Sequence, residues 1–163
     1  MNDQERRYHD AFSVAVSDVL LTMTGFEMEE DLSYEGQGCC GLEGEPQPCE
    51  ISGAMFLMGK NSGMASITMT KQTASILVSY MTGIPYYELE DEDLYDGVAE
   101  MMNLIAGRSK AILKDTDYYF EITPPFTIVG ENHFIVHKKQ SQFIQKRFIS
   151  SDLSFILKVF HIR

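Results

Sequence analysis

The chain has 163 residues, of which 44% are apolar and 23% are charged, and these are ordinary values for a globular protein. A chain of this length is expected to form one domain over residues 1–163 and to bury roughly 70% of its unfolded surface. Its net charge of −11 argues against binding to nucleic acid or to anionic membranes, because both repel an acidic surface.

The N-terminal segment carries no export pattern. Residues Met1 to Asp10 are charged and polar, so no signal peptide is visible. No apolar run in the chain approaches the length of a membrane span. We therefore expect a cytoplasmic protein.

Three cysteines, Cys39, Cys40 and Cys49, lie close together in the sequence. They cannot all pair with one another, and their spacing is not the C-x2-C of common zinc sites. Free thiols in a glycine-rich loop are the expected state in a cytoplasmic protein. A zinc site, or a metal-binding redox sensor built on this loop, is the alternative.

The first predicted helix runs from Ala11 to Thr24. Asp10 is a suitable N-cap, and Gly25 is a typical residue to end the helix. The apolar spacing predicts a buried face that consists of Phe12, Val16, Val19 and Met23.

The next part of the chain alternates between strand and loop patterns. Glu27 to Tyr34 is expected to form a strand, and the glycine- and proline-rich segment Gly36 to Pro48 to form a loop. Ile51 to Leu57 and Met64 to Thr70 predict a hairpin around the turn from Gly59 to Gly63.

Two further helices are expected. Thr70 caps a helix that runs through Met81 and ends at Gly83 and Pro85. The acidic run Glu88 to Asp93 precedes a helix that reaches about Leu113. These carboxylates either stabilise the helix N-terminus through the macrodipole or form a rim that attracts a basic partner.

The C-terminal part of the chain, Phe126 to Ile162, alternates like three strands with turns at residues 130–132 and 150–152. Helices that lead into hairpins indicate an α+β fold. We expect a two-layer domain with helices packed on a largely antiparallel sheet.

The helix that follows the acidic run has an unusual polar face. With residues about 100° apart, its apolar face contains Leu94, Val98, Met101, Ile105 and Ile112. The opposite face contains Asp96, Glu100, Asn103 and Gly107. Asn is a poor helix former and Gly costs about 1 kcal/mol relative to Ala, so this face is suited to close approach by another molecule. Asp96 has first-turn electrostatics as its alternative role, and Gly107 has packing against another element of the same chain.

The pattern acid-x-x-x-Glu-x-x-Asn, read here as Asp96, Glu100 and Asn103 with Pro124 and Pro125 downstream, resembles the CheC/CheX family of chemotaxis phosphatases. Other segments agree with this resemblance. The stretch of residues 12–26 (FSVAVSDVLLTMTGF) is similar to the first helix of CheX-like proteins. Residues 51–83 are similar to their hairpin and second helix, and residues 128–133 (IVGENH) to the turn that enters their last strands. The resemblance covers nearly the whole chain and favours the single-site CheX branch.

The resemblance also implies a duplication into two halves, each a helix followed by strands. With a shift of 82 residues, Asp18 aligns with Glu100 and Leu21 with Asn103. An apolar leucine cannot orient a water molecule, so the first copy is expected to be inactive.

The family resemblance implies a substrate, the aspartyl phosphate of a CheY-like response-regulator receiver domain. Asn103 would orient the attacking water, because an uncharged carboxamide can both accept and donate hydrogen bonds beside a phosphoryl group. Glu100 would pair with the receiver's lysine, and Asp96 and Gly107 would contact the partner. The receiver would supply Mg²⁺, so we expect no cofactor or metal of the chain's own.

CheX-like proteins further imply a homodimer, formed here through strand pairing between sheets. The alternative function is a non-catalytic dimeric CheX-like module that binds a response regulator without hydrolysing anything.

Overall fold

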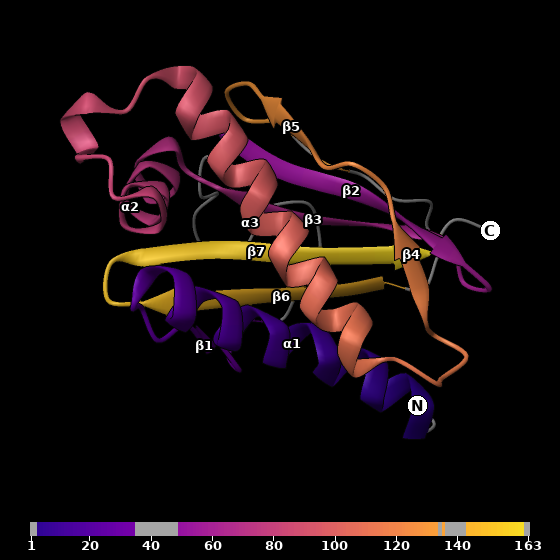
Figure 1. Cartoon of the computed structure of the whole chain (residues 1–163). Coiled ribbons are helices and arrows are strands. Elements are labelled where there is room, and N and C mark those ends of the chain that lie inside the picture. The colour runs from indigo at the N-terminus through magenta and orange to yellow at the C-terminus, as the bar shows by residue number, and fades with distance from the viewer. Residues whose placement is uncertain (1–2, 35–48, 134, 136–142, 162–163) are drawn as a thin grey trace.

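In the part of the chain that the structure describes, three helices lie on one face of a seven-stranded sheet (Figure 1). The structure is a computed structural model that describes residues 3–34, 49–133, 135 and 143–161. The helices are α1 (Asp3–Thr24), α2 (Lys71–Thr82) and α3 (Asp91–Ile112), with a short 3-10 turn η1 (Tyr86–Glu88) between the last two. The strands are β1 (Glu29–Glu30), β2 (Ile51–Gly59), β3 (Gly63–Met69), β4 (Phe120–Ile122), β5 (Phe126–Val129), β6 (Phe143–Ser150) and β7 (Leu153–His161).

The sheet is antiparallel in all of its pairs. Its strand order is β1-β6-β7-β3-β2-β4, and β5 pairs with β2 beside β4. The register places Met55, Ala65 and Val159 side by side on the helix-facing side, where all three are buried. The predicted α+β class, with helices on a largely antiparallel sheet, is therefore confirmed.

Local sequence rules explain α2 and the hairpin that precedes it. The Thr70 side chain accepts a hydrogen bond from the backbone N–H of Thr73, as expected of an N-cap. Gly83 ends the helix with a φ of 76°, a left-handed conformation that glycine adopts readily. The predicted hairpin is also confirmed, with β2 and β3 paired from Ile51–Met69 to Leu57–Gly63.

Helix α1 begins at Asp3, so the predicted start at Ala11 is wrong. The additional turns are held by contacts distant in sequence. The buried ring of Tyr8 stacks on Tyr118 and His161. Arg7 donates a hydrogen bond to the carbonyl of Ile112, which places a cation at the C-terminus of α3. Because these contacts are tertiary, helix-start rules could not find them.

Two smaller expectations also need correction, and a third falls on residues that the structure does not describe. Met23 is 37% exposed and does not belong to the buried face of α1. The predicted strand from Glu27 to Tyr34 is reduced to the two residues of β1, and the strand β4 was not predicted. The expected loop over residues 36–48 lies outside the described residues.

The buried tyrosine predicts a dependence of stability on pH. Burial, with Tyr118 nearby, raises the pKa of Tyr8 well above its ordinary value. Above about pH 10 the unfolded chain loses this proton while the folded chain keeps it, so the free energy of unfolding falls by up to about 1.4 kcal/mol per pH unit.

We expect Tyr8→Phe to remove this component of the fall, measured by urea unfolding from about pH 9 to 11. Tyr87→Phe is the matched control, because Tyr87 is 84% exposed and its substitution should leave the slope unchanged. Equal slopes for wild type and Tyr8→Phe would contradict the prediction.

Candidate functional site

The acidic run builds the start of α3. Glu90 and Asp93 form a capping box, in which each side chain accepts a hydrogen bond from the other residue's backbone N–H. Lys71 binds the Asp91 carboxylate at 2.8 Å and, chiefly through that hydrogen bond, lowers its pKa. The carboxylates of this run therefore serve at least to stabilise the N-terminus of α3.

Two glycines let α3 lie directly on its neighbours. A Cβ on Gly53 of β2 would lie 2.5 Å from the backbone oxygen of Val98, and a Cβ on Gly97 would lie 2.5 Å from the Val78 side chain of α2. Neither contact leaves space for a methyl group. The sequence analysis did not predict these roles, because only the fold shows what approaches each glycine.

The predicted division of α3 into two faces is confirmed. Leu94, Val98, Met101 and Ile105 are buried, and Ile112 is half-buried. On the opposite face Asp96 and Glu100 are exposed, while Asn103 and Gly107 are half-buried.

Glu100 and Asn103 are in direct contact on this polar face. The Asn103 amide donates from Nδ2 to Oε2 of Glu100, with 3.2 Å between the two atoms. This bond fixes the orientation of the carboxamide and leaves its oxygen to accept from a water molecule. The other oxygen of Glu100 can accept from a cation.

The described residues do not neutralise the charge of this face. Within the described residues, Asp96 and Glu100 form no ion pair, whereas Asp91, Arg108 and Lys110 of the same helix are each paired with another element. The unpaired carboxylates give the middle of α3 a negative potential that suits a basic partner group.

Gly107 lies on the same face, one turn beyond Asn103. A Cβ built on Gly107 would meet nothing within 4 Å among the described residues, so none of these residues packs closely against it. Asp96 lies one turn before Glu100 on the same face. The two prolines, Pro124 and Pro125, lie in the connection between β4 and β5.

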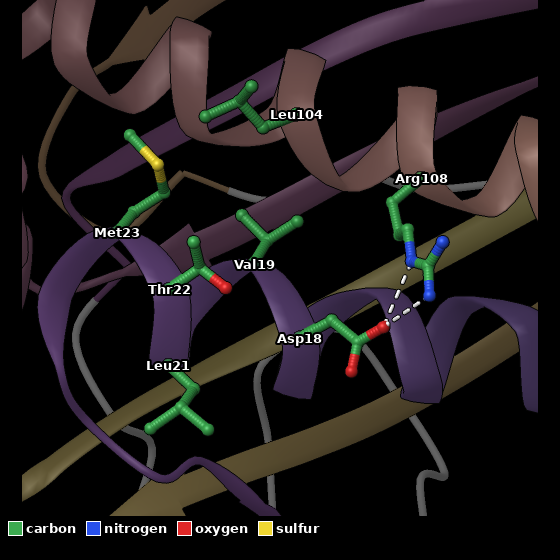
Figure 2. Close-up of a pocket in the computed structure, with 7 residues that line it drawn as sticks. All are labelled: Asp18, Val19, Leu21, Thr22, Met23, Leu104 and Arg108. Atoms are coloured by element: carbon green, nitrogen blue, oxygen red, sulfur yellow. Dashed lines mark hydrogen bonds and ion pairs between the residues drawn. The ribbon is translucent and has the colours of Figure 1, made fainter.

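The acid of the first copy, Asp18, is exposed and forms an ion pair with another element of the same chain. Arg108 of α3 donates to Oδ2 of Asp18 from Nε at 2.9 Å and from Nη2 at 2.7 Å (Figure 2). Asp18 is thus paired with a cationic side chain of the same chain, unlike Glu100 at the aligned position. The sequence analysis missed Arg108, and only the packing of α1 beside α3 reveals its role.

A groove of about 500 Å³ lies between α1 and α3, beside the polar face. It is lined by Asp18, Val19, Leu21, Thr22, Met23, Leu104 and Arg108 (Figure 2). The sequence analysis did not predict it, because its two walls are 80 or more residues apart in the chain.

The state of the cysteines differs from the one expected. Cys49 is buried and disulfide-bonded, so the expectation of three free thiols is wrong. Cys39 and Cys40 lie outside the described residues. Within the described part of the chain, no group of three His, Cys, Asp or Glu residues could hold a metal ion. In the same residues, no helix is both long and apolar enough to span a bilayer.

Comparison with known proteins settles the family. The family model described as "Chemotaxis phosphatase CheX" matches residues 51–148, which is more than half of the chain. The chain belongs to the CheX family. None of the curated proteins matches it.

Solved structures of CheX proteins superpose along nearly the whole chain. CheX from Vibrio vulnificus is 23% identical, with 99% of this chain and 100% of that chain covered and a TM-score of 0.79, and shares the fold. CheX from Desulfovibrio desulfuricans is 26% identical, with 95% and 99% covered and a TM-score of 0.75. CheX in a CheX–CheY–BeF3–Mg²⁺ complex from Borrelia burgdorferi is 28% identical, with 96% and 97% covered and a TM-score of 0.73.

The glycine contacts predict opposite effects for two alanine substitutions. Gly53→Ala should lower the free energy of unfolding by about 1–3 kcal/mol, because its methyl group would meet backbone that cannot rotate away. Gly107→Ala should raise it by about 0.5–1 kcal/mol, because the methyl group meets open space and alanine favours the helix. Urea unfolding of both variants measures the difference, and a stabilising Gly53→Ala would contradict the close approach of α3.

Proposed function

We propose that this CheX-family chain is a phosphatase that accelerates hydrolysis of the aspartyl phosphate of a CheY-like receiver domain. The observation that carries the proposal is the hydrogen-bonded pair of Glu100 and Asn103 on the outward face of α3. Membership of the CheX family and the 28% identical CheX in complex with CheY support the choice of partner.

Asn103 is proposed to orient the attacking water. Its Nδ2 is held by Glu100, so Oδ1 can accept a hydrogen bond from a water molecule placed in line with phosphorus. An aspartyl phosphate is already labile, and a hundredfold acceleration requires only about 2.7 kcal/mol of transition-state stabilisation. Positioning a single water can supply a term of this size.

Glu100 is proposed to anchor the receiver through an ion pair with its lysine. A carboxylate next to the attacking water would be repelled by the anionic phosphoryl group, so we assign Glu100 to docking rather than to catalysis. Asp96 and Gly107 would lie under the docked receiver on the same face. The receiver would contribute the phosphorylated aspartate and its Mg²⁺, and this chain would contribute no cofactor.

Asn103→Ala should abolish the stimulated decay of the phosphoreceiver while leaving binding within about twofold of wild type. Decay is measured with a panel of phosphorylated receivers, and the most responsive receiver is then used for the variant. Gln72→Ala is the control, because it removes another exposed helical amide, from α2. If the wild-type protein binds the receiver tightly but does not accelerate its dephosphorylation, the non-catalytic interaction module is favoured.

Glu100→Lys should weaken binding of a BeF3-activated receiver by at least about tenfold, because it repels the receiver's lysine. Glu100→Ala should have a smaller effect in the same titration. Glu131→Lys makes the same change of charge on an exposed turn after β5 and should bind like wild type. Equal affinities for all three variants would rule out the anchoring role.

We also propose that the chain forms a homodimer through an edge of its sheet. Strands β4 and β5 both pair with β2, and within the described residues no strand covers their outer edges. Phe126 and Val129 of β5 are 37% and 51% exposed, so this edge offers both backbone groups and apolar surface.

Light scattering at micromolar concentration should give about twice the chain mass of 18.5 kDa. Val129→Lys should shift the equilibrium towards monomer, because a charged edge disfavours strand pairing. A wild-type monomer that persists as the concentration is raised would refute the dimer.

A further inference from the structure

The groove between α1 and α3 is continuous with the proposed docking face. Leu104, which lines the groove, directly follows Asn103 and lies one turn beyond Glu100. Arg108 lies one further turn along the same side of the helix. A protein that covers Glu100 and Asn103 must therefore also cover the mouth of the groove.

Four of the seven lining residues, Val19, Leu21, Met23 and Leu104, are apolar, and the two charged ones neutralise each other. Figure 2 shows that Val19 and Thr22 point from α1 towards α3, while Leu21 points away from Leu104 at the outer side of α1. Asp18 and Arg108 form an ion pair at one end. A charged group entering this space would lose water without gaining an unpaired partner charge, so the groove favours an apolar side chain.

We infer that the groove receives an apolar side chain of the same receiver whose aspartyl phosphate faces Asn103, and that this contact decides which receivers are bound. The inference rests on the proposed function. The carboxylates and the groove would recognise different properties of the receiver. Glu100 and Asp96 offer charge to a basic group, whereas the groove tests the size and polarity of a neighbouring residue on the partner.

The first copy of the duplicated helix then has a function other than hydrolysis. Its acid, Asp18, closes one end of the groove through Arg108. The residue that follows Leu21, Thr22, forms part of the wall facing α3. Substitutions on α1 can therefore change partner choice without touching Glu100 or Asn103.

The decisive variant is Thr22→Trp, which fills the groove from α1. Its matched control is Val14→Trp, because Val14 is also β-branched and exposed on α1 but does not line the groove. Binding to a BeF3-activated receiver should weaken by at least about tenfold for Thr22→Trp and by less than about twofold for Val14→Trp. Thr22→Val, which keeps the shape of the side chain, should bind at least as tightly as wild type.

The kinetic readout separates selection from catalysis. For Thr22→Trp, the loss should lie in the half-saturating receiver concentration, whereas Asn103→Ala loses the maximal rate. Thermal unfolding checks that both tryptophan variants remain folded. Wild-type affinity in a folded Thr22→Trp overturns the inference.

The same titrations distinguish this inference from the proposed function. If receiver binding depends on Thr22 but the wild-type protein does not accelerate decay of the phosphoreceiver, the phosphatase activity is overturned and the role of the groove in binding is supported. Accelerated decay that is indifferent to Thr22→Trp overturns the groove alone. If wild type binds no receiver in the panel, both proposals fail.

Discussion

The close approach of α3 to the sheet is the constraint on which the rest of the structure depends. At Gly53 the backbone of β2 has no side chain, and the carbonyl of Val98 occupies the space that a Cβ would need. Because the helix lies this close, Leu94, Val98, Met101 and Ile105 of its apolar face are buried, and its polar face points outward. A side chain at position 53 would lift α3 and change the position of Glu100 and Asn103 relative to α1.

Charged side chains near the two ends of α3 form ion pairs, whereas Asp96 and Glu100 at its middle form none with the described residues. Asp91 binds Lys71 of α2, Arg108 binds Asp18 of α1, and Lys110 binds Glu121 of β4. Most of these side chains are exposed, so solvent screens each pair and the pairs serve mainly to orient the helix. Within the described residues, Asp96 and Glu100 in the middle of the helix form no ion pair, whereas the charges of the neighbouring groove pair with each other.

Much of the fold follows from local patterns in the sequence. The apolar repeat of α3, the Thr70 cap and the Gly83 stop of α2 are short-range effects, and each lies where the sequence places it. The outward position of Glu100 and Asn103 follows from helical periodicity alone, because the face opposite an apolar stripe is exposed. Family membership could likewise be predicted, since it depends on the order of such segments along the chain.

Long-range contacts decided the rest. The first turns of α1 form because Tyr8 packs on Tyr118 and His161, which are more than 100 residues away in the sequence. The groove and the pairing of Asp18 with Arg108 exist only because α1 lies beside α3. The sequence by itself determined which residues α3 presents on its outward face, because 3.6 residues per turn is a local property. Only the tertiary structure decided what surrounds them, because the packing of one helix against another depends on the shapes of both.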